Sequence, residues 1–579
     1  MKKYLALLLA AIMVLSMFAA CGTPNNPDTT AGNDTPDTTA GNDTPDIQGG
    51  DEPVDYVQAP DLSGQTIRIM TDESGWTTEG YAAVLPKFKQ IEELTGCTIV
   101  WETITADYGT VLQTRIAGDP AECPDIVMLT DNKAPASYID DGWVVPLSEY
   151  FDIIPNIEAW YNANPELKGQ HTYSDGEIYG LPNCAYSTLD DFNEIYAASG
   201  DHTFWYRADI ARELGYEEVP STLEEYEALM MAVKEAYPDM HPSEYVSMTG
   251  QNWASSRNWT AAFGLHFNFE STGSFYYPDA SGKVQFEPAT EAGLDWLTTM
   301  ARWYENGLMY DAGDWTPYYA NPGTGVSFSG FWNGAHGQEE NLKAIDADGE
   351  FAYMPFVPAE GYETTYLSRA VTCWSTIVVD NEDQDRLEAA LKFLDFAFYS
   401  DYGVYSNRAG VMGEGWEFGE NGEFVVNPEY MASIVEEVYN NRDSGADLWT
   451  RMCCLYDAEV TEIWTQAYND SCDANGIDYN WENQYTYDTY MTANEYNFSH
   501  VAPAYPSYYW SEDDREVIST YAGDISTFTD EYISKAILGE VDLANFQTEF
   551  VDVLYNQLHL QEVLDLHQQY YDAYVASQG

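Results

Sequence analysis

The sequence predicts an α/β fold, and two observations near its start carry this prediction. Segments of strand character alternate with segments of helical spacing, in the order strand, helix, strand, helix, strand: 66–70, 81–94, 98–101, 108–116 and 126–129. The last of them, Ile126–Leu129, is entirely apolar, as expected for a parallel strand covered on both faces, although a short core helix has the same pattern. This order predicts a parallel sheet with helices on both faces.

The helical segments carry their own signals. The 81–94 segment places apolar residues at helical spacing and is followed by Gly96, a residue that favours a helix end. Thr222 and Glu225 form a capping box that opens a long helix further along the chain. Residues 134–139 predict a short helix, and Asp175-Gly176 predicts a hairpin turn. From Ile525 to Tyr574 the chain predicts two or three amphipathic helices, whose apolar positions are Phe546, Phe550, Val553, Leu554, Val563, Leu564, His567, Tyr570, Tyr571 and Tyr574.

Three short motifs stand in order in the first part of the chain. They are Gly118-Asp119 with Pro124-Asp125-Ile126, then Tyr138 to Gly142 with Pro146-Leu147, then Asp175-Gly176 with Tyr179 to Pro182. Together they resemble the extracellular solute-binding proteins of ABC importers, in the carbohydrate-oriented family 1. The chain departs from that pattern by the inserted residues 120–123. Segments 204–226, 387–401 and the C-terminal helices are also similar to this family, in its longer-chain branch, so the resemblance runs from about residue 61 to the end.

The resemblance implies a two-lobed, periplasmic-binding-protein-like (type II) fold with hinge crossings and an α-helical C-terminal region. We expect lobe 1 to comprise residues 61–185 and about 366–410, and lobe 2 to comprise about 186–365 and 411–579. It also implies a receptor that binds an oligosaccharide and delivers it to the transmembrane subunits of a permease. We expect a monomer with no cofactor, no bound metal and no enzymatic activity.

The N-terminus predicts a secreted, lipid-anchored protein. Residues 1–20 have a charged start and an apolar core too short to be expected to span a membrane, as in a signal peptide. The segment ends at Cys21 in a sequence that resembles a bacterial lipobox, with Phe18 in place of the usual Leu. Residues 21–60 contain one nine-residue unit twice, at 29–37 and 38–46, and lack the apolar content for a core, so we expect a disordered tether. The prediction is therefore a protein on the extracellular face of the cell membrane; an ordinary cleaved signal with an incidental Cys21 is the alternative.

Composition excludes one class of partner. The chain has 96 acidic and 23 basic residues, a formal net charge of −73, which excludes nucleic acid held through its phosphates. The aromatic content of 15% fits a saccharide binder, since aromatic rings stack on the C–H faces of sugars, although most such rings must serve packing. The cysteines other than Cys21 are odd in number and unpatterned, which indicates small buried residues, with one disulfide left open.

No catalytic motif stands out. The chain lacks a nucleophile elbow, a zinc-protease helix, a phosphate loop and a dinucleotide fingerprint. Asp346 to Gly349 matches a fragment of a calcium loop, but Ala344 stands where the first ligand belongs, so a surface turn is favoured.

Candidate ligand-binding residues lie where loops leave strand ends or where the chain crosses between lobes, since ligands of open α/β sheets gather there. For each of them loop capping, core packing or ion pairing is the alternative to ligand contact. The candidates are Trp76, Glu79, Tyr108, Asp131, Asn132, Trp205, Trp253, Trp259, Trp332, Asn333, Arg369, Trp374, Trp449 and Arg451. The favoured hypothesis is a sugar-binding receptor; a surface glycoside hydrolase or lyase, or an adhesin that takes no part in transport, is the alternative.

Overall fold

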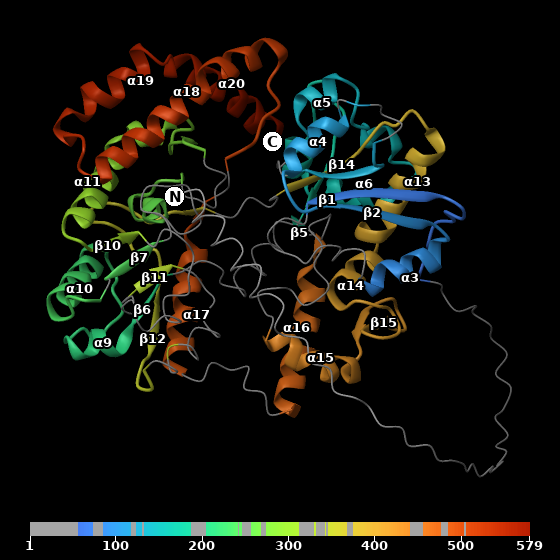
Figure 1. Cartoon of the computed structure of the whole chain (residues 1–579), viewed down its shortest axis with the longest axis horizontal. Helices are drawn as coiled ribbons and strands as arrows, with labels where there is room; N and C mark the ends of the chain where they lie inside the picture. Colours follow the sequence, from blue (N-terminus) through green and yellow to red (C-terminus); the bar gives the residue numbers. More distant parts are fainter. Residues whose placement is uncertain are drawn as a thin grey trace, which may run out of the picture. The chain divides into compact units, whose positions relative to one another are not determined.

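The computed structural model in Figure 1 gives the fold of most of the chain after residue 55. The described residues are 56–72, 85–116, 118, 123–129, 133–183, 185–186, 204–240, 242–245, 256–267, 274–311, 329–331, 342, 346–367, 374–440, 455–475, 484–502 and 505–578. The predicted signal peptide, Cys21 and nearly all of the predicted tether lie outside them.

A mixed five-stranded sheet forms the first lobe, with strand order β2-β1-β3-β14-β4. Its strands are β1 (Thr66–Asp72), β2 (Thr98–Ile104), β3 (Ile126–Leu129), β4 (Leu181–Asn183) and β14 (Trp374–Val378). β1 runs parallel to both β2 and β3, which confirms the predicted parallel order, and Ile126–Leu129 is a buried strand rather than a helix. β14 is antiparallel to both β3 and β4, so a strand that comes about 190 residues later completes the sheet.

The helices of this lobe begin and end where local sequence dictates. α3 begins at Pro86, whose fixed φ and missing N–H suit a first helical position, and ends at Gly96 with a φ of 75°. α4 spans the predicted residues, and α5 begins two residues later than predicted. The helices are α3 (Pro86–Thr95), α4 (Tyr108–Ile116), α5 (Ala136–Asp140), α6 (Pro155–Ala163), α7 (Pro165–His171), α13 (Gln384–Leu394) and α14 (Asp401–Ala409), with a π-helical turn at Asp395–Tyr399.

Elements within residues 416–440 and 455–475 also contribute to the core of the first lobe. The hairpin β15–β16 buries alternate residues, and Trp416, Phe424, Met431, Val460 and Cys472 lie in the same apolar cluster as strands β1 and β3. Our expected boundary near residue 410 was therefore placed too early. The elements concerned are β15 (Trp416–Phe418), β16 (Phe424–Val426), α15 (Pro428–Asn440) and α16 (Ala458–Asn475).

The second lobe has its own core around a short antiparallel sheet. Its central strand β6 pairs with β11 on one side and β12 on the other. As predicted, the Thr222 hydroxyl accepts a hydrogen bond from the Glu225 N–H, at 3.2 Å. The Glu225 carboxylate accepts the N–H of Ser221 rather than that of Thr222, so the reciprocal bond of the capping box is shifted by one residue. The elements are β6 (Phe204–Arg207), α9 (Ala208–Glu213), α10 (Leu223–Ala236), β7 (Ser243–Tyr245), β8 (Tyr276–Pro278), β9 (Val284–Phe286), α11 (Glu291–Glu305), β10 (Met309–Asp311), β11 (Ser329–Phe331), β12 (Phe351–Met354) and α17 (Gln484–Ser499).

Helices at the C-terminus complete this second core. They are α18 (Glu512–Ile537), α19 (Asp552–Asn556) and α20 (Leu560–Gln578), with a π-helical turn at Gln547–Val551. The predicted amphipathic pattern is confirmed, because Phe546, Phe550, Leu554, Val563 and Leu564 are all buried against α11 and α18 or their neighbours.

Short strand pairs lie where the chain leaves one core for the other. β5 (Ala185–Tyr186) pairs in parallel with β17 (Leu455–Tyr456), and β13 (Tyr366–Leu367) pairs in parallel with β18 (Val501–Ala502). β17 lies between α15 and α16 of the first lobe, and β18 lies between α17 and α18 of the second, so each crossing strand is supported by a distant segment of one lobe.

Within the described residues, no helix is both long and apolar enough to cross a membrane. The described cysteines, Cys97, Cys123 and Cys472, are all buried, as expected for small apolar side chains.

A buried carboxylate fixes the return of the chain into the sheet. Asp125, next to β3, accepts hydrogen bonds from the Arg68 N–H at 2.8 Å, from Asn381 at 2.8 Å and from Arg386 at 2.6 Å. Burial raises the pKa of Asp125, and the bonds from Arg68 and Arg386 oppose that rise. Asp125 thus binds together β1, β3 and the segment that follows β14.

We expect Arg386→Met to lower the free energy of unfolding by about 3 kcal/mol, because it leaves a buried carboxylate without its charged partner. Asp125→Asn in the same background should recover part of that loss. Urea unfolding followed by circular dichroism measures both. The control is Arg302→Met, because the Arg302 side chain is 46% exposed where it pairs with Glu227, and its loss should cost about 1 kcal/mol or less. Equal losses for Arg386→Met and Arg302→Met would contradict this account.

Candidate functional site

The carboxyl ends of β1 and β3 mark the place where an open sheet of this kind binds ligands. β1 lies between β2 and β3, so the connections from β1 to β2 and from β2 to β3 lead to opposite sides of β1. In open sheets of this kind, ligands bind beyond the carboxyl ends of the strands at such a topological switch point. Trp76 and Glu79 follow β1, and Asp131 and Asn132 follow β3, but these four lie outside the described residues.

Other predicted binding residues lie outside the described residues as well. They are Trp253, Trp332, Asn333, Arg369, Trp449 and Arg451. Trp374 opens β14, where its backbone pairs with Asn183 at the end of β4. That register places the start of β14 beside the end of β3, because the next residue, Ser375, pairs with Leu129. The backbone of Trp374 therefore lies at the carboxyl end of β3.

Tyr108 lies in the core. Its ring is 4% exposed, and its hydroxyl donates to the carbonyl of Met128 in the neighbouring strand. This bond attaches the start of α4 to β3. The structure leaves little of Tyr108 for a ligand, and we read it as a packing residue.

Trp259 and Trp205 are packing residues too. Trp259 is fully buried, with its ring stacked on Phe204 at a centroid distance of 3.9 Å and on Tyr226 at 5.1 Å. Trp205 is 6% exposed and packs against Phe351 in a small separate cluster. The expectation of ligand contact for Trp259 is wrong in this structure, because both of its faces are covered. For Trp205 the alternative, core packing, is what the structure shows.

Lys133 supplies an unusual charge at the same end of the sheet. It follows β3 after a short gap, and its Nζ is buried without a hydrogen bond. The ammonium group lies 4.1 Å from the centroid of the Tyr509 ring, a cation–π contact. Burial lowers the pKa of Lys133 to about 7, so its charge changes near neutral pH. The neighbouring His171 is also buried, and burial, followed by the nearby Lys133 charge, lowers its pKa to about 4.

Tyr509 and Arg515 bring the start of α18 to this cluster. The Tyr509 ring packs edge-on against Tyr173 at 5.0 Å, and Arg515 donates to Asp140 at 2.7 Å and to the Tyr173 hydroxyl at 3.0 Å. The Tyr173 hydroxyl in turn donates to Asp140 at 2.6 Å, and this bond, with that from Arg515, holds the pKa of Asp140 below its usual value. Residues from α5, the 172–178 hairpin and the α18 segment therefore form one polar and aromatic cluster around Lys133.

The described carboxyl groups with raised pKa serve structure. Asp125 is bonded as above, and Asp395 accepts from the Ile157 N–H at 2.9 Å and from Asn156 at 2.7 Å. A glycosidase needs a carboxylic acid of raised pKa that faces its substrate. Asp125 and Asp395 are nearly fully buried, so neither offers that group.

The calcium-loop fragment is held by an arginine. Arg207, 3% exposed, donates to Asp346 at 2.6 Å and to Asp209 at 2.5 Å. The Asp346 carboxylate also accepts the Asp348 N–H at 3.2 Å, so the turn is closed on itself. Within the described residues no group of acidic, His or Cys side chains is arranged to hold a metal ion. These contacts fit the surface turn that the sequence favours.

Known proteins resemble this chain in sequence pattern and in fold. The family of bacterial extracellular solute-binding proteins matches residues 74–402, more than half of the chain. The chain belongs to this family. No curated protein sequence matches it.

Solved structures of this class share the fold. The S. pneumoniae ABC-transporter substrate-binding protein FusA in complex with kestose is 18% identical, with a TM-score of 0.63 over 88% of this chain and 100% of that one. The alginate-binding protein AlgQ2 without calcium ion is 18% identical, with a TM-score of 0.61 over 88% and 98%. An HMO-binding, ABC-transporter-associated solute-binding protein from Bifidobacterium longum infantis is 16% identical, with a TM-score of 0.62 over 89% and 99%. The chain therefore has the two-lobed periplasmic-binding-protein-like fold, with a helical C-terminal region.

Sequence reasoning missed Lys133, Tyr509 and Arg515. The rarity of basic residues, 23 in 579, was a usable signal for Lys133, which directly follows the predicted Asp131 and Asn132. No sequence signal connects Lys133 with Tyr509, because 376 residues separate them and no local pattern spans that distance.

We expect Lys133→Met to raise the melting temperature at pH 7 by roughly 2 °C or more, because the protonated amine costs more when buried than in the unfolded chain. The folded-state pKa lies below the unfolded value of 10.5, so this cost is complete below about pH 7 and disappears as the pH rises toward 10.5. Differential scanning fluorimetry at pH 6, 7, 8.5 and 10 should show a gain that shrinks with rising pH.

The control is Lys535→Met on the exposed face of α18, where the side chain is 48% exposed and pairs only with Glu531. This substitution should change the melting temperature little at any of these pH values. A gain for Lys133→Met that is constant or grows with pH would contradict the assignment of a buried amine.

Proposed function

We propose that this protein is the lipid-anchored extracellular receptor of an ABC importer, and that it captures an oligosaccharide by hinge closure and delivers it to a membrane permease. The observation that carries the carbohydrate class is the fold similarity over 88–89% of the chain to the kestose complex of FusA, to an alginate-binding protein and to an HMO-binding protein. The family match supports the extracellular location.

The proposed mechanism requires no covalent chemistry. The chain crosses between two separate cores at segments supported by the β5–β17 and β13–β18 pairs, which makes those segments the natural hinges. A ligand that contacts both lobes favours the closed state by the free energy of those additional contacts. We propose that the ligand is held by the loop residues predicted from sequence: Trp76, Glu79, Asp131, Asn132, Trp253, Trp332, Asn333, Arg369, Trp374, Trp449 and Arg451.

The anchor completes the proposal. Acylation of Cys21 would hold the protein at the membrane, and residues 22–60 would give it reach toward the permease. Electrostatic attraction to an anionic lipid surface is not available to a chain with a net charge of −73, so the lipid must supply the attachment.

A thermal-shift screen of the protein against a panel of oligosaccharides tests the ligand class. A true ligand at about 100 times its Kd should stabilise the folded state by about 2.7 kcal/mol, a rise in melting temperature of roughly 5 °C or more. Fructans, alginate oligosaccharides, milk oligosaccharides and N-glycans form the panel. Mass spectrometry after overnight incubation should recover the ligand intact.

Variants then connect binding to the predicted residues. Trp253→Ala and Trp332→Ala should each weaken binding by roughly tenfold, since each removes one stacking face. Leu538→Ala, an exposed apolar residue 36% accessible on the C-terminal helices, is the control and should bind as wild type. Cleavage of the sugar, or binding by none of the panel while a peptide library gives a hit, would overturn the proposal.

A further inference from the structure

A tight turn in the second lobe points a lysine into a pocket. In the β8–β9 hairpin, one oxygen of Asp279 accepts the N–H groups of Ser281 at 2.8 Å and Lys283 at 3.1 Å, and the other accepts from Gln285 at 3.0 Å. These bonds fix the turn, with the Ser281 hydroxyl as an additional donor at 2.6 Å. The backbone position of Lys283 is therefore fixed by the turn.

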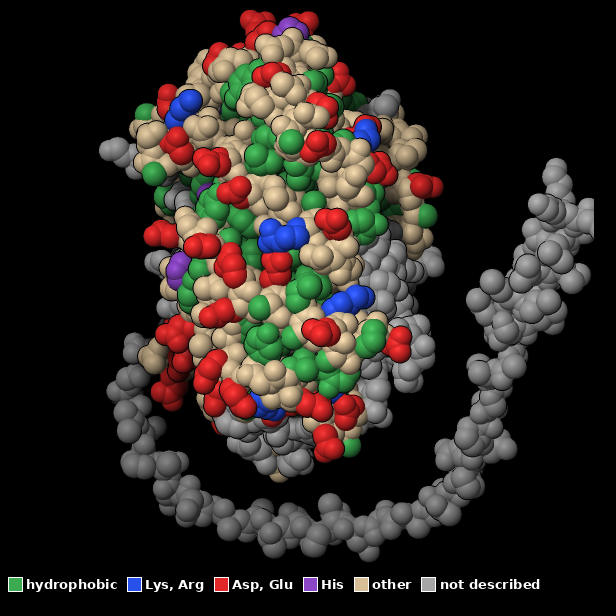
Figure 2. Space-filling view, turned by 90° about the vertical axis from the view of Figure 1, so that its left-hand side faces the viewer, with side chains coloured by type: hydrophobic (Ala, Val, Ile, Leu, Met, Phe, Trp, Pro, Cys, Tyr) green, Lys and Arg blue, Asp and Glu red, His purple; other side chains and the backbone are tan. Residues whose placement is uncertain are grey.

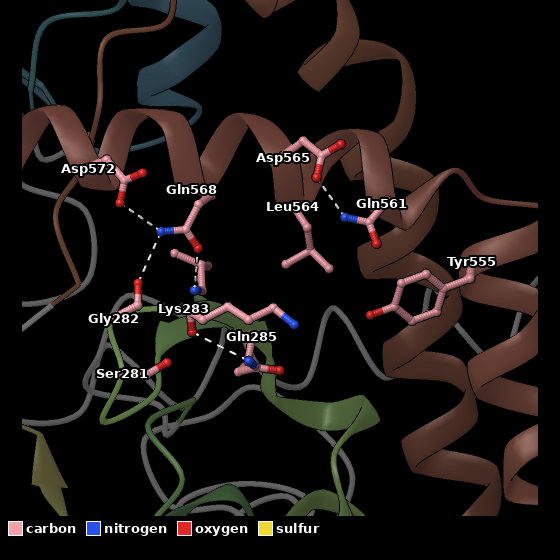
Figure 3. Close-up of a pocket in the computed structure, with 11 residues that line it drawn as sticks. Ser281, Gly282, Lys283, Gln285, Tyr555, Gln561, Leu564, Asp565, Gln568 and Asp572 are labelled. Atoms are coloured by element: carbon pink, nitrogen blue, oxygen red, sulfur yellow. Dashed lines mark hydrogen bonds between the residues drawn. The ribbon is translucent and has the colours of Figure 1, made fainter.

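Gln568 attaches this hairpin to α20. Its side-chain oxygen accepts the Val284 N–H at 2.7 Å, and its nitrogen donates to the Gly282 carbonyl at 3.0 Å and to Asp572 at 2.9 Å. Both ends of the amide are bonded, so the hairpin and the helix are held at a fixed spacing (Figure 3).

The space between them is a pocket of about 460 Å³, which falls within the usual range for small-molecule sites. The buried side chains of Val284 and Leu564 contribute apolar surface to its lining. Tyr555 of α19 forms one end, with its ring 40% exposed and its hydroxyl directed toward the pocket, while Lys283 reaches in from the hairpin (Figure 3).

Several polar groups in this pocket keep unused hydrogen-bonding capacity. In the described part of the chain, the Lys283 ammonium group and the Tyr555 hydroxyl make no hydrogen bond, and Gln561 uses only its nitrogen, which donates to Asp565 at 2.7 Å. The Gln561 and Gln285 carbonyl oxygens remain able to accept, as does the second oxygen of Asp565. The pocket thus offers donors and acceptors around an aromatic ring and an apolar surface.

We propose that this pocket is a second carbohydrate-binding site, which takes one neutral sugar residue with its C–H face against Tyr555. The hydroxyl groups of the sugar would bond to Lys283, Gln285, Gln561 and Asp565, a combination of amides and charged groups suited to vicinal hydroxyls. An anion fits less well, because a single lysine faces the carboxylates of Asp565 and Asp572 in the same lining. The acidic surface of this lobe, visible in Figure 2, also disfavours an anionic ligand.

This site lies wholly within the second lobe and needs no hinge closure. Its elements, β8, β9, α19 and α20, are all part of one core. It therefore goes beyond the proposed function, and its success or failure is independent of the ligand that the two lobes capture together.

Methyl NMR of the full chain with labelled Val and Leu residues tests the site directly, because Val284 and Leu564 line the pocket. The probes are methyl glycosides of glucose, galactose, mannose, fructose and N-acetylglucosamine, each titrated to about 20 mM, a range suited to weak single-sugar binding. We expect at least one of them to shift the Val284 and Leu564 methyl signals in a saturable manner. The signals are assigned with Val284→Ile and Leu564→Met.

Tyr555→Ala should weaken this binding by about tenfold, and Tyr555→Phe, which keeps the ring, should retain most of it. Leu538→Ala is the matched exposed control and should leave the shifts unchanged. The proposal is overturned if no glycoside shifts either signal, if Tyr555→Ala binds as wild type, or if sodium phosphate shifts the signals where sugars do not. The thermal shift with the oligosaccharide panel, measured on the same variants, reports the main site separately.

Discussion

The insertion of β14 between β3 and β4 is the constraint on which the rest of this structure depends. The strand returns after the whole first half of the second lobe and pairs antiparallel with both neighbours, so the sheet is incomplete until the chain comes back. Asp125 fixes that return by bonds to Arg68 on β1 and to Asn381 and Arg386 on the segment that follows β14. A two-lobed protein follows from this connection, since the residues inserted between β4 and β14 form a second core together with the C-terminal helices.

The aromatic residues show how such a core is stabilised under a large negative charge. The rings of Phe204, Tyr226 and Trp303 each pack against Trp259, at centroid distances of 3.9, 5.1 and 5.2 Å. Near the C-terminus, Tyr505, Trp510 and Tyr570 pack around His567, where burial lowers the histidine pKa to about 3. The aromatic excess that suggested sugar binding therefore serves packing in much of the described structure. Tyr555, by contrast, is 40% exposed.

Local chemistry made much of this fold predictable. The apolar run Ile126–Leu129, the glycine after α3 and the cap at Thr222 each act within a few residues, and the structure bears out all three. The boundary near residue 410 was wrong because the β15–β16 hairpin has no local feature that tells which core its apolar face covers. Trp259 was misjudged for a similar reason, since the amides and serines beside it in the sequence make a polar context that is unusual for a core residue. The contacts of Lys133 with Tyr509, and of the hairpin with Gln568, join residues hundreds of positions apart, so only the folded structure could reveal them.

Small-angle X-ray scattering of the unlipidated protein, with and without a saturating oligosaccharide, tests the central claim that the two lobes close on a ligand. The account predicts a smaller radius of gyration in the bound state, and a matching response to ligand concentration in scattering and in calorimetry. Stoichiometric binding of the oligosaccharide with no change in the scattering curve would contradict it.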